Sequence, residues 1–157
     1  MVRSCVAKSA ALVLMMGCGL IEAQIKSNLN GVWKMDPARS GFGTGPVSDS
    51  RLDRINIEGA TLKDTITQKL RSGPESTYDM IYTLDGKECT NHVRRNLVKS
   101  TAQMEGDVLV VNSEVFALRK ATMKDRYSVS ADGKTLTLLR HMSGAINAEQ
   151  KIVFDRQ

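Results

Sequence analysis

Few side chains in this sequence stand in a pattern that supports catalysis, and several classes of enzyme are excluded at once. The chain contains no Gly-x-Ser-x-Gly segment, no His-Glu-x-x-His segment and no phosphate-binding loop. These are the local signatures of serine hydrolases, zinc proteases and nucleotide-binding enzymes. His92 and His141 are far apart, and no Cys/His spacing fits a metal site. We therefore predict a protein that is not an enzyme and that needs neither a metal nor a cofactor.

One pair of opposite charges becomes conspicuous when the chain is folded into hairpins. A turn at Asp132-Gly133 places Asp125 directly opposite Arg140, with both side chains on the apolar face. Because an isolated buried charge costs several kcal/mol, the two must pair or stay hydrated. In one interpretation, Arg140 with Tyr127 and Tyr78 holds an anionic or hydrogen-bonding head group. In the other, the pair is a structural ion pair that fixes the register of the strands.

Four acid-glycine pairs predict the turns that position these residues. An acidic residue followed by glycine suits a two-residue hairpin loop, because that loop requires positive φ values. The pairs are Glu58-Gly59, Asp85-Gly86, Glu105-Gly106 and Asp132-Gly133. If each pair forms the two-residue loop, apolar residues face one another across the turns. The predicted partners are Ile57 with Ala60, Ile55 with Leu62, Tyr82 with Cys89, Tyr78 with Val93, Ala102 with Leu109, Val129 with Leu136, and Tyr127 with Leu138.

Between these turns the apolar residues alternate with period two, which predicts an all-β protein. We expect about ten strands, at 31–36, 51–58, 61–70, 76–84, 87–94, 97–104, 107–117, 122–131, 134–142 and 149–156. A meander of this many short strands with one apolar face favours an antiparallel up-and-down barrel, which leaves no unpaired edge. A two-sheet β-sandwich is the alternative.

Length and composition agree with one ordered domain. The chain has 157 residues with 41% hydrophobic and 25% charged side chains, and a net charge of +5. This excess is too small, and the aromatic fraction of 4% too low, to predict binding of nucleic acid.

The N-terminus has the layout of a secretory signal peptide. A short basic start precedes an uncharged apolar run over 10–20, and a small-residue cleavage site follows. We therefore expect residues 1–23 to be removed, residues 24–157 to form one domain, and the protein to be exported to a periplasm or secreted. A second interpretation is a lipid anchor on Cys18. Loss of the signal would leave Cys89 without an intrachain disulfide partner.

The segment Asn30-Gly-Val-Trp33-Lys-Met resembles the Gly-x-Trp opening of lipocalins and fatty-acid-binding proteins. The phrases Asp85-Gly-Lys-Glu-Cys-Thr-Asn91 and Ser130-Ala-Asp-Gly-Lys-Thr-Leu-Thr137 are similar to those of small bacterial lipocalin-like proteins. This resemblance covers most of the chain and implies a calycin-type barrel with Trp33 at the closed end and Arg156 laid across its ring. The glycines of 37–50 are incompatible with the two-helix lid of fatty-acid-binding proteins.

These predictions lead to a functional hypothesis: a non-catalytic, monomeric barrel that binds a small amphipathic or hydrophobic molecule. The expected cavity residues face inward in the predicted register, and they are Arg140, Tyr127, Asp125, Tyr78, Met80, Tyr82, Leu109, Val111 and Leu138. Basic residues gather at the predicted open end, which suggests attraction of anionic ligands or peripheral contact with a membrane. They are Arg39, Arg51, Arg71, Arg94, Arg95, Arg119 and the Lys124–His141 pair. The alternative hypothesis is a structural or partner-binding module of the cell envelope with a filled interior.

Overall fold

A computed structural model of the chain describes residues 28–157. The predicted signal peptide and the alternative anchor at Cys18 lie outside these residues. The described part consists of ten antiparallel strands: β1 (Gly31–Met35), β2 (Ser48–Glu58), β3 (Thr61–Leu70), β4 (Glu75–Thr83), β5 (Asp85–Val93), β6 (Asn96–Glu105), β7 (Val108–Phe116), β8 (Ala121–Val129), β9 (Thr135–Gly144) and β10 (Ala148–Arg156). None of the helices in this part is long and apolar enough to cross a membrane.

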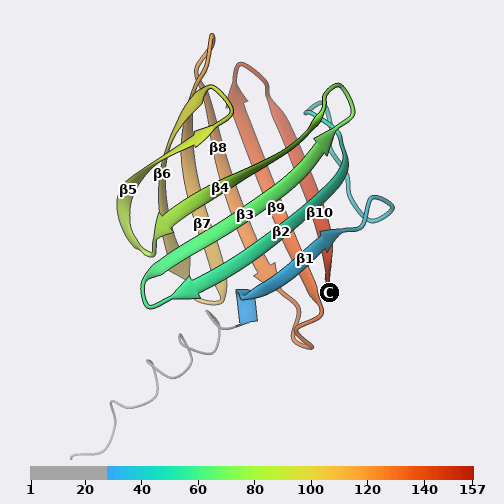
Figure 1. The fold of residues 1–157 in the computed structure, drawn as a ribbon, viewed down its shortest axis with the longest axis vertical. Helices are drawn as coiled ribbons and strands as arrows, with labels where there is room; N and C mark the ends of the chain where they lie inside the picture. Colours follow the sequence, from blue (N-terminus) through green and yellow to red (C-terminus); the bar gives the residue numbers. More distant parts are fainter. Residues whose placement is uncertain (1–27) are drawn as a thin grey trace, which may run out of the picture.

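The strands form one sheet in the order β4-β3-β2-β1-β10-β9-β8-β7-β6-β5, so the first strand pairs with the last. Figure 1 shows β1–β4 crossing in front of β7–β10, so that the sheet curls round a single interior. The predicted all-β barrel is therefore confirmed, and the sandwich alternative is wrong. Residues 36–47 contain no helix. They contact strand β10 through an antiparallel bridge between Gly41 and Lys151.

The barrel is nearly closed, and the incomplete seam lies between β4 and β5. No backbone ladder joins these strands, so the predicted pairs across Asp85-Gly86 are wrong. The Asn91 amide replaces the ladder, since its Oδ1 accepts from Ile81 N at 2.8 Å and its Nδ2 donates to Ile81 O at 2.9 Å. The Cys89 sulfur accepts from Thr83 N at 3.2 Å, so this residue lies half-buried in the seam rather than in the interior. Side chains thus stand in for backbone partners at this seam.

Two further hairpins have the predicted faces but a shifted register. Glu58 pairs with Thr61 and Glu105 with Val108, so the loops are Gly59-Ala60 and Gly106-Asp107. Each glycine has positive φ and the residue after it does not, as in a turn that takes glycine at its first central position. The partners of Ile57 and Ala102 are therefore Leu62 and Val111, two residues beyond the predicted ones. A shift of two residues leaves every side chain on its predicted face.

The fourth hairpin has the predicted register. Val129 pairs with Leu136 and Tyr127 with Leu138, across a loop in which Ser130 N donates to Thr135 O. All four acid-glycine turns lie at one end of the barrel, together with the start of β1 (Figure 1). This end is called the closed end below, and the opposite end the open end.

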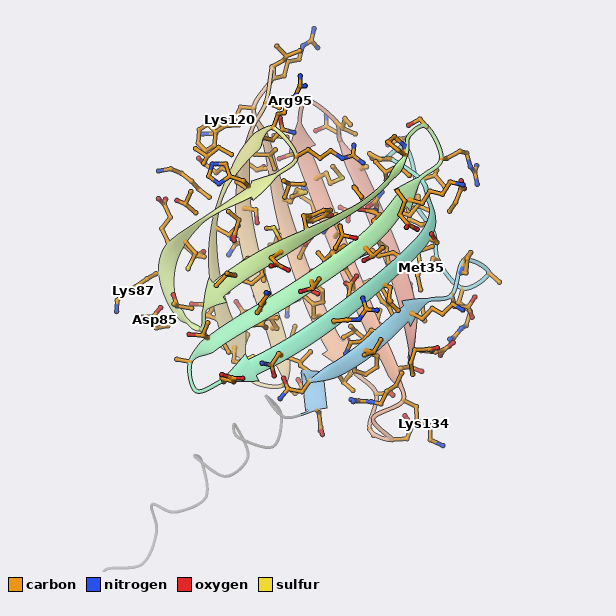
Figure 2. All side chains as sticks on the ribbon, in the orientation of Figure 1. Met35, Asp85, Lys87, Arg95, Lys120 and Lys134 are labelled. Carbon is orange, nitrogen blue, oxygen red and sulfur yellow. The ribbon has the colours of Figure 1, made fainter. Side chains whose placement is uncertain are left out.

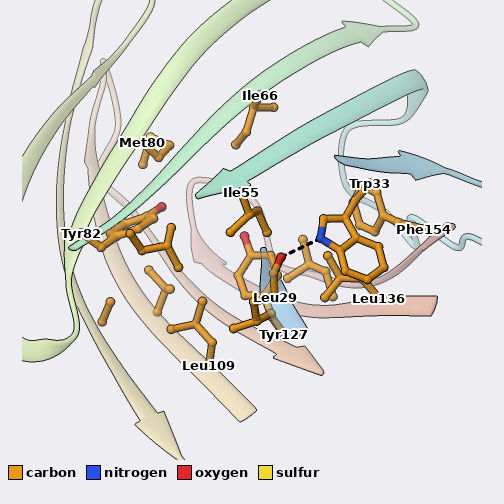
Figure 3. Close-up of a cluster of buried hydrophobic side chains, with 14 of the residues drawn as sticks. Leu29, Trp33, Ile55, Ile66, Met80, Tyr82, Leu109, Tyr127, Leu136 and Phe154 are labelled. Carbon is orange, nitrogen blue, oxygen red and sulfur yellow. Dashed lines mark hydrogen bonds between the residues drawn. The ribbon is translucent and has the colours of Figure 1, made fainter. Parts of the chain in front are cut away.

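The closed end is filled by Trp33, which is fully buried and donates from Nε1 to Leu29 O at 2.8 Å (Figure 3). The Arg156 guanidinium lies 4.2 Å from the centre of the indole ring, and the two residues are register partners. Arg156 also donates to the carbonyl oxygens of Gly133 at 2.6 Å and Asn30 at 2.7 Å. The cation–π contact expected for these two residues is therefore present.

Candidate functional site

The interior of the barrel holds all nine residues that the sequence predicts for a cavity. Six of them belong to the buried apolar core, Tyr78 packs against that core, Asp125 is a buried polar residue, and Arg140 keeps 17% of its side chain exposed. They come from β4 (Tyr78, Met80, Tyr82), β7 (Leu109, Val111), β8 (Asp125, Tyr127) and β9 (Leu138, Arg140). Because side chains alternate along each strand, residues two apart on these strands share the inner face. Their role in binding a ligand stays a prediction.

Asp125 and Arg140 are register partners on β8 and β9, as predicted. Arg140 donates from Nε to Asp125 Oδ1 and from Nη2 to Oδ2, each at 2.7 Å. Burial lowers the pKa of the Arg140 guanidinium, but the charge and hydrogen bonds of Asp125 outweigh it and leave that pKa above its ordinary value. Asp125 thus occupies the Nε and Nη2 edge of the Arg140 guanidinium, so this edge cannot form a bidentate contact with a second anion.

A second ion pair lies inside the barrel, and the sequence-based prediction missed it. Arg51 donates to both carboxylate oxygens of Asp53 at 2.8 Å, and the two side chains are 1% and 0% exposed. The prediction that Arg51 belongs to a basic rim is therefore wrong. Strand β2 begins at Ser48, three residues earlier than expected, and Arg51 continues the inward alternation of Asp53, Ile55 and Ile57. That alternation of Arg-x-Asp with two isoleucines was the signal available in the sequence.

Asp64 is a third buried acid on the inner face, and it too was missed. It lies on β3 with 3% exposure, and its Oδ1 has no hydrogen-bond partner within residues 28–157. Burial raises the pKa of Asp64 well above its ordinary value; the charge of Asp53 adds to this effect, and that of Arg51 opposes it. The sequence signal was the alternation of Leu62, Asp64 and Ile66, in which an acid occupies an apolar position.

Three tyrosines surround this polar interior. Tyr78 donates to Gln68 Oε1 at 3.1 Å, whereas the rings of Tyr82 and Tyr127 lie in the apolar cluster that contains Met80 and Leu109 (Figure 3). Burial is the main cause that raises the pKa of all three phenols, so they are neutral hydrogen-bonding groups at physiological pH.

A cavity of about 140 Å³ opens into the interior at the open end. It lies between β2–β3 and β9–β10, under Pro46, and Arg140 is part of its wall. The other lining residues are Ser48, Gln68, Leu70, Met142, Gln150 and Ile152. Gln150 is held in place by donating to Pro46 O at 3.1 Å. The cavity therefore has a polar side and an apolar side, and it leads to the ion pair of Arg140 and Asp125.

Two larger hollows lie on the outside of the sheet. One of about 540 Å³ lies over β1–β3 beside Lys34 and Leu52, and one of about 390 Å³ lies over β5–β9 beside Asn112 and Lys124. In the described part of the chain, no three His, Cys, Asp or Glu side chains gather in a way that could hold a metal ion.

The predicted basic rim is only partly present. Arg71, Arg94, Arg95 and Arg119 lie in the turns of the open end, where Figure 2 labels Arg95 and Lys120. Arg39 lies instead on the flank of the barrel, ion-paired with Asp36 and with Asp155 near the closed end. His141 is exposed and contacts Glu149, while Lys124 is its register partner on the outer face. The basic rim therefore consists of residues in the turns of the open end, and it does not include Arg51, which lies in the interior.

Comparison with known proteins identifies the architecture. No family model and no curated protein matches the chain. Among solved structures, an abundant heat soluble (SAHS) protein of Ramazzottius varieornatus has a TM-score of 0.59 at 15% identity, over 83% of this chain and 96% of that one. A Schistosoma mansoni fatty acid binding protein in complex with arachidonic acid has a TM-score of 0.57 at 12% identity, over 84% and 98% of the two chains.

Zebrafish ileal bile acid-binding protein in complex with cholic acid gives a TM-score of 0.51 at 16% identity, over 83% of this chain and 98% of that one. At these identities the likeness shows the fold alone. The chain therefore has the calycin-type barrel that its sequence predicted, whereas the meaning of the Gly31-Val-Trp33 opening as a family motif stays a prediction.

Proposed function

We propose that this protein binds a small amphipathic molecule inside the barrel and does not catalyse a reaction. The observation that carries the proposal is the composition of the interior. The mouth of the barrel, which is the cavity at the open end, has polar and apolar walls and includes Arg140, and deeper in the barrel the buried Oδ1 of Asp64 lacks a partner in the described chain. Buried polar atoms without partners are rare in folded proteins and call for an explanation such as a ligand or an ordered water. Fold neighbours in complex with arachidonic acid and with cholic acid support this use of the barrel.

Native mass spectrometry of the freshly purified mature protein tests the proposal. We expect a small-molecule adduct that dissociates on unfolding, and an increase in melting temperature with members of a panel of lipids and small amphiphiles. A Met142→Trp variant fills the mouth and is expected to lose both effects. Leu139→Trp is the matched control, because Leu139 lies on the same strand, β9, but points outward and is 48% exposed. An absence of adducts and of thermal shifts in the unmodified protein would refute ligand binding.

The alternative is a module of the cell envelope with a filled interior, and the small volume of the mouth favours it. In that case Met142→Trp would be tolerated or stabilising, and no ligand would change the melting temperature. We also propose export, on the basis of the N-terminal pattern. Detection of a form beginning near residue 24 in the periplasm or medium would support it, and an intact N-terminus in the cytoplasm would refute it.

A further inference from the structure

The chemistry of the interior identifies a ligand group through Asp64. This side chain points inward from β3, where its register partners on the two flanking strands are Ile55 and Met80. Its neighbours along the strand on the same face are Leu62 and Ile66, and all four are buried. None of these four side chains can donate a hydrogen bond, so they do not compensate the free-energy cost of burying the carboxyl group.

The charges in the barrel indicate which kind of group is missing. The guanidinium of Arg51 is bound by Asp53, and that of Arg140 is bound by Asp125. Both buried cations therefore already have a carboxylate. The group without a partner is an acid, so the chemistry of the interior calls for one more positive charge or hydrogen-bond donor rather than for another anion.

The aromatic residues near Asp64 suit a positive charge. Tyr82 and Tyr127 are both buried, and after burial the Asp64 charge is among the causes that raise the pKa of their phenols. Tyr78 and Met80 lie on the adjacent strand on the same face. Aromatic faces attract ammonium groups, and more strongly when water is excluded.

We propose that the interior binds the ammonium group of a small primary amine, with Asp64 as its ion-pair partner and the tyrosine rings around its apolar body. This inference rests on the proposed function and names its ligand class. It replaces the anionic head group expected at Arg140, because the Arg140 fork is taken by Asp125.

Binding of an ammonium ion to a protonated Asp64 releases the carboxyl proton to solvent and leaves a carboxylate–ammonium pair. Affinity for the amine therefore rises with pH wherever free Asp64 is protonated. The other titratable groups that face this position are Arg51 and Asp53 on β2, Tyr78 and Tyr82 on β4, Asp125 and Tyr127 on β8, and Arg140 on β9. From the outer face of β4, the charge of Asp79 also raises the pKa of Asp64. Burial raises the pKa of the phenols above the neutral range, so comparison with Asp64→Asn isolates the contribution of Asp64 to the pH dependence.

Three probes of equal size test the inference by titration calorimetry: phenethylamine, phenethyl alcohol and phenylacetic acid. We expect the amine to bind about tenfold or more tightly than the alcohol, because a close buried charge pair contributes at least this much. We expect the acid to bind most weakly. Asp64→Asn should remove the preference for the amine and its pH dependence while leaving the affinity for the alcohol unchanged.

Glu149→Gln is the matched control, since it changes the net charge equally but lies exposed on the outer face of β10 beside His141, and its charge is not among those that shift the pKa of Asp64. It is expected to bind all three probes as the unmodified protein does. Equal binding of amine and alcohol, tighter binding of the acid, or an amine preference that survives in Asp64→Asn would overturn the inference while leaving ligand binding intact. Failure of every probe, together with an absence of adducts in native mass spectrometry, would overturn the proposed function as well.

Discussion

The buried pair of Arg140 and Asp125 allows a quantitative test of how this barrel is held together. We consider Arg140→Met, Asp125→Leu and the double variant. The N–O separation of 2.7 Å corresponds to an attraction of about 6 kcal/mol at an effective dielectric constant of about 20. The cost of removing two charges from water offsets most of this, so the pair as a whole contributes little net stability.

The single variants behave differently from the pair. Arg140→Met leaves the Asp125 carboxylate buried without a partner, and we expect a loss of about 3–5 kcal/mol in the free energy of unfolding. Asp125→Leu should cost less, about 2–3 kcal/mol, because the Arg140 side chain is 17% exposed and lines the cavity at the open end, so it is not left fully buried without a partner. The double variant should lie within about 1 kcal/mol of the unmodified protein, which makes the coupling energy large.

Urea unfolding followed by tryptophan fluorescence measures all four proteins, because Trp33 is the single tryptophan of the sequence and is buried at the closed end. The exposed pair of Arg126 and Glu105 is the control, with side chains 40% and 43% exposed and a similar distance of 2.9 Å. Its cycle should give a coupling several-fold smaller than that of the buried pair, because exposed charges are screened by water and salt. A coupling below about 1 kcal/mol at Arg140–Asp125, or additive single variants, would refute the interpretation of this pair as a buried ion pair that fixes the register.

Three further predictions address the other unusual contacts. Arg156→Met removes three carbonyl contacts and the stacking on Trp33, so we expect a loss of about 2–4 kcal/mol in the free energy of unfolding and a shifted tryptophan emission. An unchanged emission would contradict the cation–π contact. The pKa of Asp64 is higher in the folded than in the unfolded protein, so the protonated form favours folding. The free energy of unfolding therefore falls as pH rises from the unfolded pKa near 3.8 toward the folded pKa, by up to about 1.4 kcal/mol per pH unit. Asp64→Asn should remove this fall, as urea unfolding at mildly acidic and neutral pH would show, and parallel pH profiles of the two proteins would argue against it. Asn91→Ala should leave the Ile81 amide at the seam without its partner, so we expect faster hydrogen exchange of that amide and a loss of about 1–3 kcal/mol in the free energy of unfolding. Unchanged protection of the amide would mean that another group closes the seam.

The sequence predicted the barrel because each strand alternates cleanly and each acid-glycine turn carries a glycine with positive φ. Alternation determines the face of a side chain but not its partner. In two hairpins the loop began at the glycine instead of the acid, which moved the partners of Ile57 and Ala102 by two residues. The register around Asp132-Gly133 was centred correctly, so the pairing of Asp125 with Arg140 could be predicted.

Other features depend on long-range contacts that no local pattern encodes. The seam between β4 and β5 depends on an asparagine side chain that replaces backbone partners, while the sequence around Asp85-Gly86 reads like any other hairpin. Arg51 was assigned to the rim because charges are usually exposed, and its burial depends on Asp53 lying two residues further along the same face. Asp64 occupies an apolar position of the alternation, but its lack of a partner is visible only once the whole inner face is assembled.

This unpartnered acid also bears on the choice between a filled barrel and a binding barrel. In a barrel that served the fold alone, replacing Asp64 with leucine among Ile55, Leu62, Ile66 and Met80 would improve burial and remove a charge that opposes folding above pH 3.8. Neither of the two paired arginines donates a hydrogen bond to it, since each is held by its own carboxylate. A carboxyl that weakens the folded state and whose Oδ1 receives no hydrogen bond is understandable if its partner arrives from solvent, which is what a bound amine would supply. Asp64 therefore supports the proposed binding barrel even though it weakens the fold.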